Sequence, residues 1–222
     1  MRCFTELCLK PENPEEIISL VKSLGYSSIG LSEKIESDTI DIVSRLDLNP
    51  KNPNELLRSL RNQRWKTEVI TVNCRSKSVA RQAGKDRRVD LITYPILDKW
   101  KNNHLDRQQA GLMRDSGSGY LIDLSQLLID DAYLLRKRIE FIKRNKDNAV
   151  KRGVPVVASS CATDVWGLRD PHGLAALLSL IDVDEDHGLD MVSNNPYGLV
   201  DKNRVKLKDS YILEGVWVIE DE

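Results

Sequence analysis

The sequence Gly119-Tyr-Leu-Ile-Asp-Leu124 precedes an amphipathic segment at residues 127–151, which is followed by Val154-Pro-Val-Val-Ala-Ser159. The two short segments have the apolar, β-branched character of buried strands, whereas apolar residues recur in the long segment at helical spacing. A strand, a helix and a second strand joined by a short return form a parallel crossover unit. This unit predicts an α/β fold, and loop 160–171 leaves the end of the sheet where such folds keep functional residues.

The same alternation continues through the rest of the chain. Further strands are expected at 3–9, 28–32, 41–48, 67–73 and 89–94, and helices at 14–24, from residue 55, and at 76–84. Residues 98–118 lack a regular pattern and could be an insertion or a shortened helix. About seven strands in units of near thirty residues favour a TIM-like α/β barrel, with an open sheet as the alternative. We expect one barrel domain over 1–205 and a tail over 206–222, whose apolar strip 211–219 could be an extra strand, a clamp on the barrel or a docking strip.

The net charge of −1 conceals strongly charged blocks. Residues 58–88 hold ten lysines and arginines against two acids, and residues 136–152 hold eight against two. The last seventy residues hold thirteen acids against five bases. Such polarity favours a polyanionic partner, although basic runs also solvate outer helix faces. The acidic block would then face solvent or a basic protein partner.

Motifs for catalysis are scarce in this chain. The three histidines, at 104, 172 and 187, form neither His-x-His nor a zinc-protease motif, and the chain has no phosphate-binding glycine-lysine loop. Ser159, Ser160 and Cys161 precede Asp164 and His172, but the glycine-flanked nucleophile elbow is missing, and serine at a strand end more often caps a turn. We therefore expect no catalytic residue and no bound metal.

Cysteine usage and hydropathy indicate the compartment. The four cysteines, at 3, 8, 74 and 161, form no close framework and are interpreted as reduced, packed thiols. No window approaches a membrane span, and Glu6 interrupts any apolar run at the start. These features predict a cytoplasmic protein without a membrane association.

A series of short motifs carries a family resemblance. In chain order they are Tyr26-Ser-Ser-Ile-Gly-Leu31, Val43-Ser-Arg-Leu46, Val89-Asp-Leu-Ile-Thr93, Tyr120-Leu-Ile-Asp-Leu124, Val154-Pro-Val-Val-Ala-Ser-Ser160, Gly167-Leu-Arg-Asp-Pro171 and Ser193-Asn-Asn-Pro196. Over residues 1–205 the set resembles the protein component 3 family of archaeal ribonuclease P, whose eukaryotic counterpart is the thirty-kilodalton subunit. The resemblance implies a TIM-like barrel related to PHP-type phosphoesterase barrels but without their metal ligands.

The resemblance also implies a function and partners. A member of this family would assist the ribonuclease P RNA in removing the 5′ leader from precursor tRNA, without being catalytic itself. It would have no cofactor of its own, since Mg²⁺ belongs to the RNA component. Its partners would be that RNA, precursor tRNA indirectly, and other protein subunits, especially a small subunit that pairs with it in a two-plus-two complex. The alternatives are a metal-dependent phosphoesterase or other barrel hydrolase, and a protein-interaction scaffold with no role in RNA.

Basic side chains are the expected RNA contacts, because they neutralise phosphates. The candidates are Arg75, Arg81, Arg87, Arg88, Arg169, Arg107, Arg114, Lys137, Arg144 and Lys151. Arg169 could instead form a local ion pair that fixes its turn. The low aromatic content favours binding to the RNA backbone over base stacking.

Overall fold

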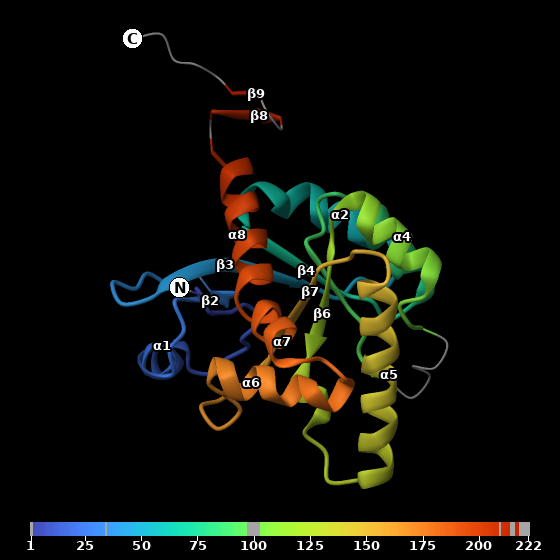
Figure 1. Ribbon diagram of the computed structural model, residues 1–222. Helices are drawn as coiled ribbons and strands as arrows, with labels where there is room; N and C mark the ends of the chain where they lie inside the picture. The colour runs from blue at the N-terminus through green and yellow to red at the C-terminus, as the bar shows by residue number, and fades with distance from the viewer. Residues whose placement is uncertain (1, 34, 97–102, 209, 214–215, 218–222) are drawn as a thin grey trace.

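A wholly parallel seven-stranded sheet forms the centre of the protein, with its strands in sequence order from β1 to β7. The computed structural model describes residues 2–33, 35–96, 103–208, 210–213 and 216–217. The strands are β1 Thr5–Glu6, β2 Ser28–Leu31, β3 Asp41–Leu48, β4 Val69–Asn73, β5 Leu91–Thr93, β6 Gly119–Asp123 and β7 Val156–Ser159. The sheet curls into a nearly closed barrel surrounded by helices (Figure 1). The predicted α/β barrel of seven parallel strands is therefore confirmed.

Helices connect the strands and cover the outside of the barrel. They are α1 Pro14–Ser23, α2 Pro53–Gln63, α3 Lys77–Lys85, α4 Arg107–Ser116, α5 Ala132–Val150, α6 Pro171–Leu177, α7 Glu185–Met191 and α8 Asn194–Lys206. Several begin at a residue whose side chain accepts a backbone N–H of the first turn, as Ser76 does for α3 and Asp106 for α4. None of the helices within these ranges has the length and hydrophobicity to cross a membrane.

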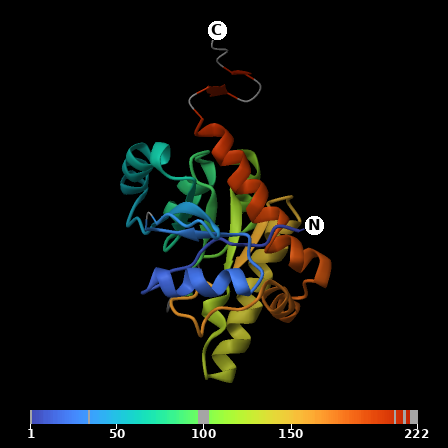
Figure 2. The ribbon, with the colours of Figure 1, turned by 90° about the vertical axis from the view of Figure 1, so that its left-hand side faces the viewer.

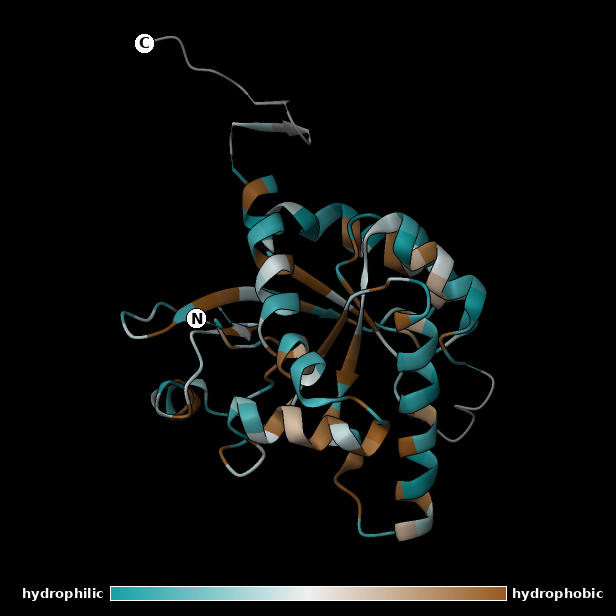
Figure 3. Ribbon diagram, viewed as in Figure 1, coloured by the Kyte–Doolittle hydropathy of each residue, from teal (hydrophilic) through white to brown (hydrophobic). Residues whose placement is uncertain are grey.

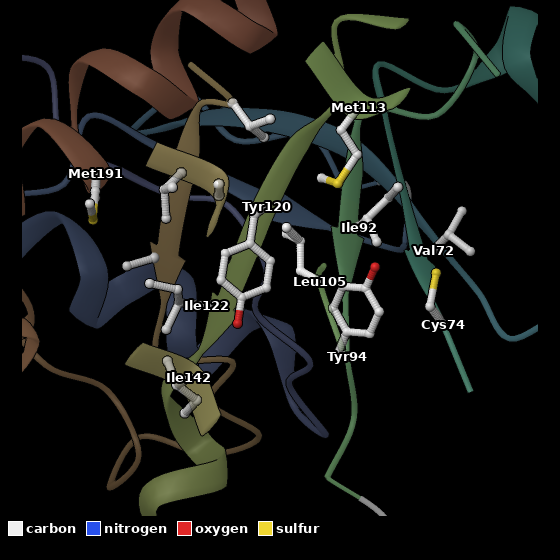
Figure 4. Packing of buried hydrophobic residues seen from close by; sticks show 14 of the residues in the cluster. Val72, Cys74, Ile92, Tyr94, Leu105, Met113, Tyr120, Ile122, Ile142 and Met191 are labelled. Atoms are coloured by element: carbon white, nitrogen blue, oxygen red, sulfur yellow. The ribbon is translucent and has the colours of Figure 1, made fainter. Parts of the chain in front are cut away.

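The apolar residues pack both inside the barrel and between its strands and the surrounding helices. In Figure 3 the strands are mostly hydrophobic, whereas the helices carry much of the hydrophilic sequence. The outer layer includes Tyr94, Tyr120 and Ile142, which Figure 4 shows together. Inside the barrel, alternate strand residues such as Val43, Val69 and Leu121 form a second cluster. This interior is a packed core rather than a channel.

The gap between β7 and β1 is closed by a side chain. Within the described residues these two strands share no backbone ladder, but Glu6 of β1 is fully buried beside β7. Its carboxyl group accepts hydrogen bonds from Ser159 Oγ and, at 3.1 Å, from Ser160 N. Burial raises the pKa of Glu6, although these hydrogen bonds work in the opposite direction. This buried carboxyl group thus bridges the two strands, and just beyond them Lys10 N and Glu12 N donate to Ala162 O and Thr163 O at 2.9 and 3.0 Å.

Helix α8 covers the amino end of the barrel, which is the end where the parallel strands begin. Figures 1 and 2 show it leading toward the carboxyl terminus of the chain. Val200 belongs to the interior apolar cluster, and Leu199 packs against that cluster. The helix is therefore part of the barrel core and not an external appendage.

One expected helix begins later than predicted, and a stretch left open between an insertion and a shortened helix contains a helix. The long helix α5 begins at Ala132 rather than at 127, because Asp131 caps it and residues Leu124–Leu127 form a separate 3₁₀ turn. Leu128, which lies within the predicted helix but before the observed cap, is 67% exposed. In the irregular stretch 98–118 the structure has helix α4, which Gly117 ends in the left-handed conformation with φ 81°.

The remaining expectations fall near the two termini. The predicted strand 3–9 is paired only at Thr5 and Glu6. Residues Tyr211–Leu213 and Val216–Trp217 form a small antiparallel hairpin, β8 and β9. The side chains of most of the apolar strip 211–219 lie outside the described part, so its docking role stays a prediction, as does the domain boundary at 205.

Candidate nucleic-acid interface

The carboxyl end of the barrel, where the parallel strands finish, is polar. Strands β4 to β7 end on Asn73, Thr93, Asp123 and Ser159. TIM-barrel enzymes hold their reactive groups at this end, because the loops that follow the strands converge there. Its chemistry therefore bears on any enzymatic function.

Two basic residues at this end are bonded within the protein. The Arg45 side chain is completely buried, donates to Leu9 O at 2.9 Å and pairs with Asp47 at 2.7 Å. Lys10 Nζ lies 3.9 Å from Asp123 Oδ2. Asp47 and Asp123, which could each serve as a ligand or base at this end, thus face a cation of the same chain.

The groups that could have suggested a nucleophile have structural partners. Ser159 Oγ donates to Glu6, and the His172 ring packs against Phe4 with 5.4 Å between ring centroids. Burial raises the pKa of Cys161 well above its ordinary value, so its thiol stays protonated near neutral pH. In the described ranges, no group of three or more His, Cys, Asp and Glu residues is placed to hold a metal ion.

At the amino end, a buried ion pair organises the surface. Arg64 Nη1 donates to Asp90 Oδ2 at 2.5 Å, and Asp90 also accepts from Ile70 N at 2.7 Å and from Asn203 Nδ2 at 2.8 Å. Burial raises the pKa of Asp90, against the opposing effect of Arg64. Asn203 belongs to α8, so this cluster joins the helix to the starts of β4 and β5.

Arg204 forms a second attachment of α8 to the barrel. Its guanidinium donates two hydrogen bonds of 2.8 Å to Asp41 and one of 2.5 Å to Glu68. Bidentate pairs of this kind fix geometry as well as adding binding energy. Arg204 therefore sets the position of the basic face of α8 over the amino end.

Two adjoining pockets form a groove beside α8, which we call the amino-end groove. One, of about 290 Å³, includes Arg87, Gly117, Lys202 and Lys206 in its lining. The other, of about 190 Å³, shares Arg87 and Lys206 and continues to Trp65. A Cβ atom added at Gly117 would lie 3.5 Å from Lys202 Nζ, which places that ammonium group over the turn that ends α4. The groove is thus bordered by cations from three segments of the chain.

The predicted arginines are distributed over both ends of the barrel. Arg75 follows β4 and lies at the carboxyl end, whereas Arg87 and Arg88 precede β5 and lie at the amino end. The two ends are about 16 Å apart, which is the length of the five-residue strand β4. Arg75 and Arg87 are both exposed and form no ion pair among the described residues. They cannot belong to one compact site.

Three predicted contacts are bonded internally. Arg81 pairs with Asp106 at 2.6 Å and donates to Gln109 at 3.1 Å. Arg88 forms a two-point contact with Asp86 at 2.7 and 2.9 Å. Arg169 donates to the carbonyl oxygens of Trp166 and Leu168 at 2.7 and 2.6 Å, so backbone contacts, and not the suggested ion pair, fix this turn. An RNA contact by these three residues stays a prediction.

The other predicted residues lie on outer helices. Arg107 is exposed at the first position of α4, and Arg114 pairs with Asp115 near its end. On α5, Lys137 lies 3.8 Å over the Tyr133 ring, and Arg144 lies 5.9 Å from the Phe141 ring centre. Lys151 is exposed where α5 ends. These five do not border the amino-end groove.

Reasoning from sequence missed important residues of this groove. Trp65 is 79% exposed, and Trp166 at the other end of the barrel is 85% exposed. The protein therefore does present aromatic faces, in contrast to the expectation from its low aromatic content. Lys202 and Lys206 were missed because they fall within the acidic carboxyl-terminal block, most of whose acids lie outside α8. The sequence Arg64-Trp-Lys66, an aromatic residue within a basic block, was the available signal for Trp65.

Comparison with known proteins places the chain in a family. Residues 4–208, nearly the whole described chain, match the family RNase P subunit p30. Ribonuclease P protein component 3 of Methanosarcina mazei is 30% identical over 219 residues, which cover 94% of this chain and 90% of that relative. The corresponding protein of Methanococcoides burtonii is 27% identical, with 93% and 88% covered.

Solved structures agree on the fold. A chain in a cryo-EM structure of archaeal ribonuclease P with mature tRNA is similar with a TM-score of 0.84 and 20% identity, covering 98% of this chain and 99% of that one. An ochratoxinase from A. niger is similar with a TM-score of 0.60 and 9% identity, covering 90% and 71%. The barrel is thus shared with an enzyme that is only 9% identical in sequence, so the fold alone does not assign a family. The match of residues 4–208 to one sequence family does: the chain belongs to the RNase P subunit p30 family.

Proposed function

We propose that this chain is a protein subunit of ribonuclease P that assists the catalytic RNA in removing the 5′ leader from precursor tRNA. The observation that carries the proposal is the family match over residues 4–208, which spans every strand of the barrel. The relatives are named ribonuclease P protein component 3 and match over most of their own length. The match thus extends over most of the length of these subunits.

The carboxyl end of the barrel supports a role without protein-based catalysis. Arg45 and Lys10 are directed at Asp47 and Asp123 there, and Ser159 is bonded to Glu6. A catalytic RNA supplies the chemistry in the proposed role, so the protein contributes folding and positioning of RNA. We keep the prediction that the protein has no cofactor of its own and that Mg²⁺ belongs to the RNA component.

Exposed cations are the proposed RNA contacts. Arg75, Arg87, Arg107 and Lys151 are exposed and have no ion-pair partner among the residues described, so their charge is available to phosphates. Arg81, Arg88 and Arg114 also remain candidates, although each is engaged by an acid of this chain. Arg169, Lys137 and Arg144 complete the predicted set. Neutralising phosphates releases counterions, which makes such binding strongly salt-dependent.

We also propose partners and a location for this subunit. It would bind ribonuclease P RNA directly and precursor tRNA indirectly, and it would pair with a small protein subunit. The acids at 182–190, around the start of α7, are separated from the bases of α8 and offer a surface for a basic protein. Assembly on this RNA would place the chain in the cytoplasm.

Reconstitution tests the proposal. Ribonuclease P is assembled from its RNA and proteins with and without the full chain, and 5′-leader removal from precursor tRNA is measured. We expect addition of the chain to raise cleavage at low Mg²⁺, and the chain to co-purify with the RNA and with a small protein subunit. A phosphatase activity that needs no RNA, or an assembled enzyme indifferent to the chain, would contradict the proposal.

A further inference from the structure

The exposed position of Trp65 is unusual for so large an apolar side chain. Its ring lies in a 3₁₀ turn, Arg64–Lys66, between α2 and the start of β4, and 79% of the residue is exposed. Trp and Tyr usually find apolar partners when a fold forms, and those left exposed in a structured position often mark binding surfaces. An exposed tryptophan alone does not identify a ligand, so the class of ligand has to be inferred from the residues around it.

The turn that carries Trp65 is held rigidly by its neighbour. Arg64 is buried and donates to Asp90, to Arg88 O and to Glu68 O, the last two at 3.2 Å. These bonds tie the turn to the starts of β4 and β5. The indole is therefore presented from a fixed backbone, which reduces the entropy lost when a ligand binds.

The groove beside Trp65 is cationic. The pocket next to its ring includes Arg64, Arg87, Arg88 and Lys206, and none of its lining residues among those described is acidic. The adjoining pocket contributes Lys202, whose ammonium group lies over the turn at Gly117. Arg87 and Lys202 have no ion pair within the described chain, whereas Arg64 and Arg88 are held by Asp90 and Asp86. The groove thus places the exposed indole of Trp65 beside several positively charged side chains.

We propose that the amino-end groove binds a single-stranded segment of RNA, with an unpaired base stacked on Trp65 and the adjacent phosphates at Arg87 and Lys206. This assignment deepens the proposed function and rests on it. Bases within a duplex are already stacked and paired, so an indole face selects unpaired nucleotides, while the cations bind any phosphate backbone. The charge of the lining favours RNA over a protein partner, which would have to be strongly acidic.

Binding of short RNAs to the full chain tests the inference. The probes are a labelled single strand of about ten nucleotides, which is within the usual site size, and a fully paired RNA duplex of the same length. Affinities are measured by fluorescence anisotropy for the wild type and for Trp65→Ala, Trp65→Phe and Arg87→Ala. Trp166→Ala is the matched control, since it removes an equally exposed tryptophan from the opposite end of the barrel.

The expected pattern separates stacking from charge. Trp65→Ala should weaken single-strand binding by about tenfold, which is typical of losing one stacked base, and should leave duplex binding and the salt slope unchanged. Trp65→Phe should retain most of the affinity. Arg87→Ala should weaken both probes and lower the slope of log affinity against log salt by about one. Trp166→Ala should match the wild type.

Other outcomes overturn the inference without touching the subunit assignment. Suppose that the wild type binds ribonuclease P RNA, but Trp65→Ala and Trp166→Ala lose equal affinity for the single strand, or neither loses any. The stacking site at Trp65 would then be contradicted. Unchanged RNA binding by Trp65→Ala together with lost association with another protein subunit would make the groove a protein interface. A wild type that fails to bind ribonuclease P RNA as well would instead contradict the proposed function.

Discussion

Arg45 and Arg64 are both buried arginines in this barrel, yet they serve its two ends differently. Arg45 is bonded to backbone carbonyls and to Asp47, and with the Lys10–Asp123 pair it occupies the carboxyl end with internal contacts. Arg64 is bonded to Asp90 and stabilises the turn that presents Trp65, beside the outward cations Arg87 and Lys202. The end that barrel enzymes use for chemistry has a pocket of about 160 Å³ beside Asn73, Thr93 and Asp123. The opposite end carries the larger, cationic groove.

The difference shows that a barrel does not dictate where its function lies. The fold is shared with an ochratoxinase at a TM-score of 0.60. In TIM-barrel enzymes the carboxyl end holds the reactive groups and the amino end mainly stabilises the fold. In this chain the bonds that attach α8 at the amino end also position the groove, so the proposed RNA binding would give that end both tasks. Function has to be argued from the side chains at each end.

The largest effect is expected at the carboxyl end from Glu6→Ala. Glu6 is fully buried, and its removal leaves Ser159 Oγ and Ser160 N without their acceptor and opens a cavity at the β1–β7 junction. We expect a loss of about 3 kcal/mol in the free energy of unfolding, measured by urea denaturation. Cys3→Ala, at an exposed position on the same segment, is the control. A loss below about 1 kcal/mol would mean that the barrel closes without this side chain.

A smaller effect is expected at the amino end from Asn203→Ala. Asn203 donates to Asp90 Oδ1 and Glu68 O, both at 2.8 Å, and its loss leaves a buried carboxyl group with fewer donors. We expect unfolding to become easier by about 1–2 kcal/mol, with faster amide exchange in α8. Lys202→Ala, one residue earlier and exposed, should be nearly neutral. If the two variants behaved alike, α8 would not be attached through this cluster.

The sequence specified most of the fold because local signals agreed with the packing. The limits 41–48 of β3 were predicted to the residue, although its burial alternates only around Val43 and Arg45. The starts of α1 and α3 were predicted to within one residue, and Ser76 caps α3, whereas Asn13 makes no side-chain capping bond. The starts of α4 and α5 were missed because the capping roles of Asp106 and Asp131 were not recognised among nearby acids.

The candidate site was less accessible from sequence, because it depends on where segments meet. Arg75 and Arg87 were grouped because both fall in one basic block of the sequence. In a parallel sheet, however, a residue that follows one strand lies at the opposite end from a residue that precedes the next strand. The acidic total of the last seventy residues concealed Lys202 and Lys206 on α8. Arg81 pairs with Asp106, which is 25 residues away, because α3 packs against α4. A local sequence pattern cannot predict such a contact.

Arg75→Ala and Arg87→Ala determine which end of the barrel faces the RNA. Both side chains are exposed and lack an ion pair in the described structure, so neither change should lower stability appreciably. If the amino end faces the RNA, Arg87→Ala should reduce the slope of log affinity against log salt by about one, and Arg75→Ala should leave it unchanged. The measurement is binding of the full chain to ribonuclease P RNA over a salt series. The reverse result would move the interface to the carboxyl end, and equal losses would require RNA to contact both ends.

The smallest effect at neutral pH is expected from Arg81→Met, which tests whether this predicted contact is occupied internally. Partial burial acts to raise the pKa of Asp106, but hydrogen bonds from Arg81 and Gln109 N outweigh it and lower the pKa from 3.8 to about 2. A carboxyl group with a lowered pKa stabilises the fold above its ordinary pKa and loses this contribution as the pH falls toward the lowered one. For Asp106 that window runs from about pH 4 to pH 2. Arg81→Met should therefore raise the pKa of Asp106 toward 3.8 and make stability fall less steeply across this window.

Carboxyl titration by NMR measures the pKa of Asp106 directly, and urea unfolding at several acidic pH values measures its effect on stability. Lys77→Met is the matched control, because Lys77 Nζ lies 3.6 Å from the same carboxylate but is mostly exposed, so its removal should shift the pKa much less. The salt slope of RNA binding should be nearly the same for Arg81→Met and the wild type, since a guanidinium held by Asp106 adds little net charge at the surface. An Asp106 that still titrates near pH 2 in Arg81→Met, together with a lowered salt slope, would return Arg81 to the RNA-facing set and weaken the distinction between paired and outward arginines.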